Sequence, residues 1–233
     1  MLQRFAGPFR EFGFFAGLLY AIDRTFIRLF PACRLYFYEI MVQPIPDTAL
    51  LPPRFSKQLE IREIKQGDAE VNFMPPPPAI KEFRFRQNAL CLGAFRKGEL
   101  IGYIWFCLRS YDEDEVRCTF VLTPADESVF DFDLYLFPEH RMGLGFVGLW
   151  NEANKFLHSR GIRYAFSRLT RFNLASRRAH QHLGWKRVGR TIFLQTGPVE
   201  LMVGTISPYF HVSLAKSSRV RLKLSPDVLL ADE

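Results

Sequence analysis

Three side chains in the second half of the sequence have types and spacing suited to moving a proton. Asn173, Ser176 and His180 stand at positions i, i+3 and i+7, so a helix that begins near Asn173 places all three on one face. Asn173 is a favourable N-cap for that helix and Gly184 a favourable stop. A histidine exchanges a proton near neutral pH, so His180 is a candidate catalytic residue. The alternative is a surface histidine beside His182.

A strand, a glycine-bearing turn and a helix follow one another over residues 130–150. Apolar residues alternate over Phe130–Leu136 as in a strand, and from Phe146 they recur at helical spacing. Gly143 and Gly145 stand between the two patterns. There, bare backbone N–H groups and the positive end of a helix dipole can bind an anion. The alternative is that the glycines only let a helix start in a tight space.

These stretches resemble two motifs of the GNAT superfamily of acyl-CoA-dependent N-acyltransferases. The first motif is Gln/Arg-x-x-Gly-x-Gly/Ala after a splayed strand, and the chain has His140-Arg141-Met142-Gly143-Leu144-Gly145. Here His140 occupies the Gln/Arg position and Arg141 comes one place late. The looser similarity extends over about Leu59–Gly204, most of the chain.

The second GNAT motif has Asn, a small residue, usually a Tyr, and then Leu-Gly-aromatic. The chain matches it at Asn173 and Ser176, and it ends the motif with Leu183-Gly184-Trp185. His180 replaces the usual tyrosine, so the identity of the proton donor stays open.

The resemblance implies acyl transfer from a CoA thioester to an amine. In GNAT enzymes the splayed strand gives a backbone N–H to the thioester oxygen, which implies an oxyanion donor at Leu136 or Phe137. The glycine turn of the family binds pyrophosphate, which implies a cradle made of Arg141, Met142, Gly143, Leu144 and Gly145. The resemblance also places Asn173 and Ser176 at the CoA, with His180 as the proton donor.

Acyl transfer also needs a base for the amine. Asp131 and Asp133 alternate with phenylalanines, so a regular strand puts both carboxylates on its other face. Either carboxylate is a candidate base, directly or through water, and Glu139 is a weaker third candidate. The alternative is that these carboxylates cap loops or pair with nearby arginines.

The elements that position these residues predict a mixed α/β (α+β) fold. The resemblance implies a GNAT-type central twisted mixed sheet with flanking helices. Further strands are predicted over Arg34–Val42, Leu59–Ile64, Ala89–Phe95, Leu100–Leu108, Val116–Leu122, Ile162–Leu169, Arg187–Leu194 and Val199–Ile206. The interval between Gly67 and Asn88 has little helical periodicity, so the acceptor wall that GNAT folds build there is expected to be short or looped.

Three segments are expected along the chain. Residues 1–54 form an N-terminal amphipathic segment, a strand and a proline-rich linker, and residues 55–207 form the acyltransferase domain. Residues 208–233 are expected to be an irregular extension, with a basic patch at Lys216–Lys223.

The N-terminal segment has an aromatic helical stripe. Its apolar run, Phe12–Ile22, is too short to span a bilayer. At helical spacing the apolar positions are Phe12, Phe15, Leu19, Ile22, Phe26 and Leu29/Phe30, with arginines near the other side. Residues 9–30 can therefore contact a membrane peripherally. They can instead pack on the chain's own domain, or on a second subunit in a homodimer.

The amino-acid composition indicates which kinds of ligand the protein is expected to bind. A formal net charge of +7 and a pI near 9.4 favour anionic ligands. Between Lys155 and Arg190 there are ten Lys/Arg and no Asp or Glu, but the patterns of RNA-binding modules are missing, so no nucleic acid is expected. The four cysteines have no metal-ligand spacing and are expected to be buried thiols of a cytoplasmic protein. The acidic cluster at Tyr111–Glu115 is expected to be a solvated turn rather than a metal site.

The expected function is an acyl-CoA-dependent N-acyltransferase that uses acetyl-CoA, or another acyl-CoA, and no metal. Two alternatives remain open at this point. One is a long-chain acyltransferase at the membrane, and the other is a non-catalytic GNAT-like domain that binds CoA. The amine acceptor does not follow from the sequence.

Overall fold

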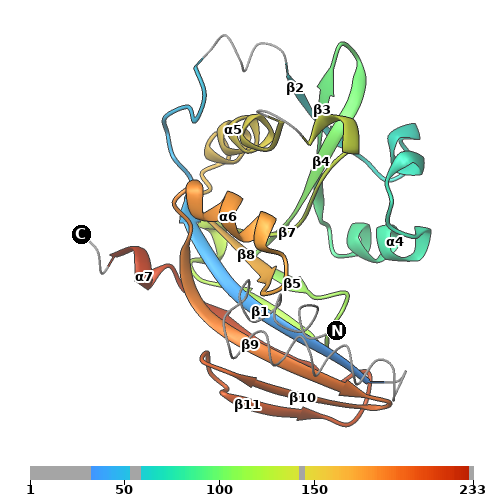
Figure 1. Ribbon diagram of the computed structural model, residues 1–233, viewed down its shortest axis with the longest axis vertical. Helices are drawn as coiled ribbons and strands as arrows, with labels where there is room; N and C mark the ends of the chain where they lie inside the picture. Colours follow the sequence, from blue (N-terminus) through green and yellow to red (C-terminus); the bar gives the residue numbers. More distant parts are fainter. Residues whose placement is uncertain (1–32, 53–58, 142–144, 231–233) are drawn as a thin grey trace, which may run out of the picture. The chain divides into compact units, whose positions relative to one another are not determined.

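The computed structural model describes residues 33–52, 59–141 and 145–230. The chain forms two compact units, which are described separately (Figure 1). Unit 1 contains the described residues of 33–43, 112–120 and 168–230, and unit 2 those of 44–111 and 121–167. The N-terminal amphipathic segment that the sequence predicts lies outside the described residues.

Unit 2 is built on a mixed sheet. Its strands, in sheet order, are β8 (Tyr164–Thr170, in this unit up to Ser167), β7 (Ser128–Leu136), β4 (Glu99–Leu108), β3 (Leu90–Arg96) and β2 (Glu60–Ile64). Strands β7 and β8 are parallel, and the other neighbours are antiparallel. The predicted mixed α/β class is therefore confirmed.

The hairpin between β3 and β4 forms where the sequence predicts it. Its two turn residues, Lys97 and Gly98, have φ values of 53° and 83°. Positive φ at both central positions suits the two-residue turns that match the twist of a hairpin.

A helix covers each face of this sheet (Figure 1). On one face Trp150 of α5 (Gly145–His158) packs edge-on against Phe106 of β4. On the other face Phe85 of α4 (Pro78–Arg86) packs against the neighbouring residue, Trp105. Successive residues of a strand point to opposite faces, so the two contacts place the helices on opposite sides.

The interval between Gly67 and Asn88 is more ordered than the sequence suggests. It contains a 3-10 helix, η1 (Ala69–Phe73), and then α4. Pro78 is the first residue of α4, where its missing N–H costs nothing and its fixed φ suits a helix. The proline run thus starts a helix. Of the two expectations for this interval, short or looped, the looped one is corrected, because the interval holds a 3-10 helix and one short α-helix.

A β-bulge changes the faces of β7. Trp105 of β4 pairs with Asp133, whereas the next residue, Phe106, pairs with Asp131. Phe132 is therefore the extra residue, and the alternation on its two sides is out of phase. Asp133 lies on the α4 face with Trp105, and Asp131 on the α5 face with Phe106. The regular alternation that predicted a shared face for the two carboxylates is wrong.

Unit 1 contains an antiparallel sheet. Its strands, in order, are β11 (Phe210–Ser213), β10 (Val199–Gly204), β9 (Lys186–Thr196) and β1 (Cys33–Pro44, in this unit up to Gln43). Helix α6 (Leu174–His182) and the second part of β8 belong to the same unit. Strands β1, β9 and β10 were predicted close to their observed places, the first of them from its β-branched and aromatic content.

The C-terminal residues are structured, which corrects the expected irregular extension. They form β11, β12 (Val220–Leu224) and α7 (Asp227–Leu230). Val220, Leu222 and Leu224 are 0–2% exposed, so the second half of the predicted basic patch lies in a strand with a buried apolar face. Strand β12 lies next to β6 (Cys118–Leu122), which lies next to β5 (Ser110–Asp112).

The acidic stretch is not a solvated turn. Tyr111 and Glu113 are buried, at 0% and 1% exposure.

Among the described residues no group of His, Cys, Asp and Glu is arranged to hold a metal ion. The described helices include none that is long and apolar enough to cross a bilayer. All four cysteines are buried free thiols, as expected. Short 3-10 turns, η2 (Ala125–Glu127) and η3 (Pro138–His140), flank β7.

Candidate functional site

Strand β7 extends past its last partner in β8. The parallel pairs run from Ser128–Tyr164 to Asp131–Ser167, whereas β7 continues to Leu136. The backbone groups of the last β7 residues that point away from β4 therefore lie on an edge beyond the β8 register.

Leu136 directs its backbone toward that edge. The N–H of Phe137 donates to the carbonyl oxygen of Ile101 in β4, at 3.1 Å. Because backbone direction alternates along an antiparallel pair, the N–H and C=O of Leu136 point away from β4. Of the two predicted oxyanion donors, Phe137 is already used by the sheet, and Leu136 has the suitable direction.

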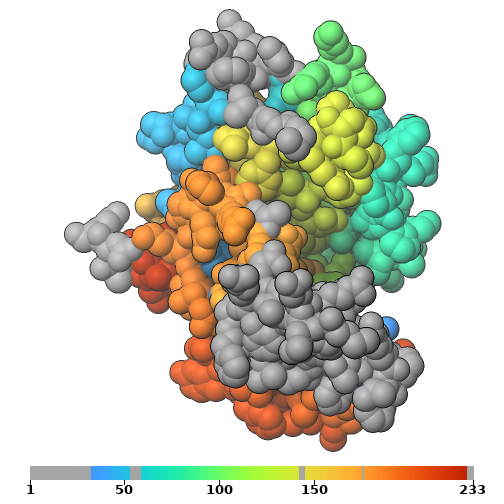
Figure 2. Space-filling view, in the orientation of Figure 1, coloured from blue at the N-terminus to red at the C-terminus, as the bar shows by residue number. Residues whose placement is uncertain are grey.

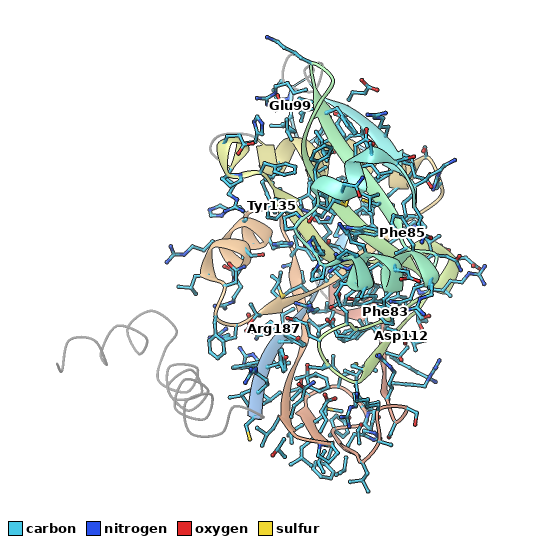
Figure 3. All side chains as sticks on the ribbon, turned by 90° about the vertical axis from the view of Figure 1, so that its right-hand side faces the viewer. Phe83, Phe85, Glu99, Asp112, Tyr135 and Arg187 are labelled. Atoms are coloured by element: carbon cyan, nitrogen blue, oxygen red, sulfur yellow. The ribbon has the colours of Figure 1, made fainter. Side chains whose placement is uncertain are left out.

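Arg141 is anchored at the end of β7. Its Nε donates to the Leu136 carbonyl oxygen at 2.9 Å, and its guanidinium lies 5.2 Å from the ring centroid of Tyr135. Tyr135, labelled in Figure 3, stacks on Tyr103 with centroids 5.5 Å apart. The side chain of Arg141 is exposed, so a cation is held beside the strand end and in reach of solvent.

Helix α5 begins at Gly145, directly after residues 142–144, which the structure does not describe. A Cβ on Gly145 would lie 2.6 Å from the carbonyl oxygen of His140, so this position needs glycine for close backbone approach. The first N–H groups of a helix have no intrahelical partner and carry positive dipole charge. The predicted cradle residues Met142, Gly143 and Leu144 lie outside the described residues.

The two candidate carboxylate bases have different partners. Asp131, 3% exposed, accepts a hydrogen bond from the Ser167 hydroxyl at 3.1 Å. Asp133 forms an ion pair with Arg84 of α4 at 2.5 Å. Glu139 is exposed in η3. The pairing of Asp133 with an arginine matches the alternative reading of its role.

Arg84 is the partner of the candidate base Asp133, and the sequence did not reveal this pairing. Its side chain is 8% exposed, and its guanidinium lies 5.7 Å from the Trp105 ring centroid and 5.2 Å from that of Phe132. An arginine that contacts aromatic rings on one side and a carboxylate on the other holds the rings and the carboxylate in fixed orientations. The signal in the sequence that could have located Arg84 is the proline run before it, since a proline suits the first position of a helix.

Asn173 caps α6 as predicted. Its side-chain oxygen accepts from the N–H of Ser176 at 3.0 Å, which satisfies one of the open donors at the helix start. Gly184, with a φ of 82°, follows the helix end, also as predicted. The CoA contacts expected for Asn173 and Ser176 stay predictions.

His180 is buried, at 3% exposure, so it is not the surface residue of the alternative reading. Its Nδ1 lies 2.7 Å from the carbonyl oxygen of Ser176. A carbonyl can only accept, so Nδ1 carries a proton, and in the neutral ring Nε2 is then an acceptor. The Trp185 ring packs edge-on against the imidazole, with centroids 4.9 Å apart.

A buried carboxylate in unit 1 gathers four arginines, which the sequence analysis missed. Glu39 of β1 contacts Arg171 at 2.5 Å, Arg177 at 2.8 Å, Arg190 at 3.2 Å and Arg187 at 3.7 Å (Arg187 is labelled in Figure 3). Burial acts to raise the pKa of Glu39, but Arg171 and Arg177 outweigh it and the pKa lies below its ordinary value. The run of basic residues after Lys155 is thus partly neutralised inside the protein.

A second buried network surrounds Arg168 of β8. Its guanidinium forms two hydrogen bonds with Glu113, at 2.8 and 2.9 Å, and an ion pair with Glu115 at 2.7 Å. Tyr38 donates to Glu115 at 2.9 Å, and burial raises the pKa of Tyr38 well above its ordinary value. The acidic stretch therefore has a partner within unit 1.

The candidate residues fall into two groups. Unit 2 brings together Leu136, Arg141 and Gly145, the strand end and the helix start. Unit 1 brings together Asn173, Ser176 and His180 on the face of α6.

Comparison with known proteins finds likeness at the level of structure. No family model and no curated protein matches the chain. Among solved structures, it is similar to a tandem GNAT protein from the clavulanic acid biosynthesis pathway, at 15% identity and a TM-score of 0.48 over 73% of this chain and 57% of that one. It is also similar to a putative GNAT-family acetyltransferase from Novosphingobium aromaticivorans, at 15% identity and a TM-score of 0.43 over 70% of this chain and 66% of that one.

A third similar structure is an aminoglycoside acetyltransferase from an uncultured soil metagenomic sample, in complex with sisomicin. The identity is 14% and the TM-score 0.36, over 55% of this chain and 88% of that one. The chain spans less than two thirds of the length of the first two structures. The solved structures that this chain is similar to therefore include proteins named as GNAT acetyltransferases.

Proposed function

We propose that the protein is an acyl-CoA-dependent N-acyltransferase that prefers acetyl-CoA. The observation that supports this proposal is the free edge of β7. There Leu136 directs its N–H away from β4, and α5 begins nine residues further along the chain.

The edge suits a thioester attached to a peptide-like arm. The amides of pantetheine can hydrogen-bond to a strand edge as an added strand does. The N–H of Leu136 then donates to the thioester oxygen, and this bond strengthens as the oxygen becomes an oxyanion. A pyrophosphate that follows the arm meets the positive start of α5 and the guanidinium of Arg141.

The amine attacks the thioester carbonyl, a C–N bond forms, and the C–S bond breaks as CoA leaves as a thiolate. We assign the proton of the amine to His180, because its neutral tautomer offers Nε2 as an acceptor. This assignment replaces the proton-donor role that the resemblance implies, since a donor at Nε2 requires the doubly protonated ring.

Leu136→Pro tests the oxyanion donor. Proline removes the N–H of Leu136, which is not part of the β4 ladder. We expect kcat to fall about 10²–10³-fold, with little change in acetyl-CoA affinity. Leu136→Ala is the matched control, because it shortens the same side chain but keeps the N–H. Equal loss of kcat in both variants contradicts the assignment.

Native mass spectrometry with acetyl-, octanoyl- and palmitoyl-CoA tests the proposal as a whole. It is followed by a screen of amines for release of free CoA thiol. We expect acetyl-CoA to bind and at least one class of amine to release thiol. Binding of palmitoyl-CoA alone favours the long-chain enzyme, and binding without thiol release favours the non-catalytic domain. Failure to bind any CoA ester overturns all three.

A further inference from the structure

One face of the unit 1 sheet carries two rows of apolar side chains across its four strands. The strand register defines the rows. The first row is Leu35, Leu194, Leu201 and Val212. The second row is Phe37, Ile192, Val203 and Phe210. We call these eight side chains the apolar face.

The two faces of this sheet are buried to different degrees. On the opposite face Phe193 and Met202 are 0% and 1% exposed. On the apolar face Val203, Phe210 and Val212 are 54%, 60% and 37% exposed and Leu201 is half-buried, whereas Phe37 of β1 is only 3% exposed. The strands β10 and β11 reach the molecular surface, as the orange-red atoms of Figure 2 show. The contiguous exposed apolar side chains of β10 and β11 mark an interaction surface at this end of the face.

Helix α6 covers one end of the same face. Glu39 follows Phe37 by two residues on β1, so both point to the same side, and Glu39 contacts Arg177 of α6. The two apolar rows lie beyond this contact, toward Cys33 at the start of β1. A second layer on the apolar face therefore sits next to α6.

We propose that residues 12–30 of this same chain form a helix that packs across the apolar face. The point where they join β1 supports this occupant. Cys33 shares the strand face of Leu35 and Phe37, and it pairs with Thr196 at the edge of the rows. The described part of unit 1 therefore begins, at Cys33, at the border of the apolar face.

Pattern and size support the same occupant. The stripe Phe12, Phe15, Leu19, Ile22, Phe26 and Leu29 repeats at helical spacing. Nineteen helical residues span about 28 Å, and a helix is about 10 Å wide. The apolar face measures about 14 Å across four strands, and its two rows are about 7 Å apart. One helix laid across the strands thus covers both rows and buries its own aromatic stripe.

Photo-crosslinking in the full chain tests this contact. The photoreactive residue p-benzoylphenylalanine replaces Leu201 on the apolar face. Irradiation of the dilute protein should give cross-links to residues 12–30 within the monomer, identified by mass spectrometry. The matched control carries the same residue at Phe73, an exposed aromatic of unit 2 (68% exposed), and should give none to this segment.

Three further experiments distinguish residues 12–30 from other possible occupants of the apolar face. In a mixture of isotopically heavy and light chains, cross-links between the two isotopes show a second copy instead and overturn the proposal. Vesicles of phosphatidylcholine and phosphatidylglycerol should leave the cross-link unchanged, whereas its loss with sedimentation of the chain favours a membrane. Leu19→Lys in the stripe should remove most of the cross-link and Arg24→Ala should keep it. The absence of any cross-link to residues 12–30 in the unsubstituted stripe also overturns it.

Discussion

The Nδ1–H group of His180 donates a hydrogen bond to the carbonyl oxygen of Ser176, one turn earlier in α6, at 2.7 Å. This bond fixes the tautomer and turns Nε2 into the reactive nitrogen of the neutral ring. The Nδ1 of His182 makes the same hydrogen bond to the backbone carbonyl oxygen of Arg178, also at 2.7 Å, but the His182 side chain is exposed. The two histidines of one helix therefore differ in burial and not in their backbone hydrogen bond.

His180→Phe should lower kcat by about 10²–10⁴-fold, the usual range for a lost acid or base, while CoA binding persists. His182→Phe is the matched control and should leave kcat near the unsubstituted value. Unchanged kcat in His180→Phe, measured at saturating acetyl-CoA, removes the residue from the reaction.

Asp133→Asn should destabilise unit 2, because it leaves the guanidinium of Arg84 without its carboxylate partner. Breaking a buried ion pair costs about 3–5 kcal/mol, and we expect about 3 kcal/mol because Asp133 is 24% exposed. Urea denaturation measures the change in the free energy of unfolding. The double variant Asp133→Leu with Arg84→Met should recover part of the loss. Additive losses in this cycle contradict a coupling between the two residues.

The sequence indicated much of the fold because most strands have clear turn residues or alternation at their ends. The hairpin at Lys97–Gly98 and the stop at Gly184 follow from local backbone chemistry. The C-terminal strand β12 was missed, although its apolar residues alternate with Arg221 and Lys223. Interpreting that stretch as a charge patch hid the period of two. The alternation is plain in the structure, where Leu222 is 0% exposed.

The site was less predictable because it depends on one inserted residue and on distant partners. The bulge at Phe132 has no marker in the sequence, yet it reverses the face of Asp133 relative to Asp131. Glu39 finds its arginines up to 151 residues away along the chain. Such pairings depend on strand order, which local pattern does not contain.

Gly145→Ala should destabilise the protein by about 1–3 kcal/mol, the range for overpacking, because its Cβ meets the backbone oxygen of His140. Gly148→Ala is the matched control within the same helix. There the Cβ meets the end of the Leu59 side chain, which can move, and alanine improves helix propensity by about 1 kcal/mol. Thermal or urea unfolding of both variants checks the difference. Equal effects contradict the close approach at Gly145.

Glu39→Gln should be the most destabilising single change of a charged residue in unit 1. It removes the only carboxylate that the four surrounding arginines share among the described contacts, and we expect a loss of about 3–5 kcal/mol at pH 7. Glu99→Gln, on an exposed hairpin residue labelled in Figure 3, is the control and should change little.

The pH dependence of the same variant tests the cause. The pKa of Glu39 is lowered on folding from an ordinary value of 4.5, so the unfolded chain takes up its proton first as pH falls. The stabilisation by ionised Glu39 is therefore fully present above about pH 4.5 and is lost as pH falls through the lower, folded pKa. The free energies of unfolding of the unsubstituted protein and of Glu39→Gln, measured from pH 7 down to the acid limit of folding, should converge only on the acid side. A constant difference across that range would show that Glu39 acts through packing and not through its charge.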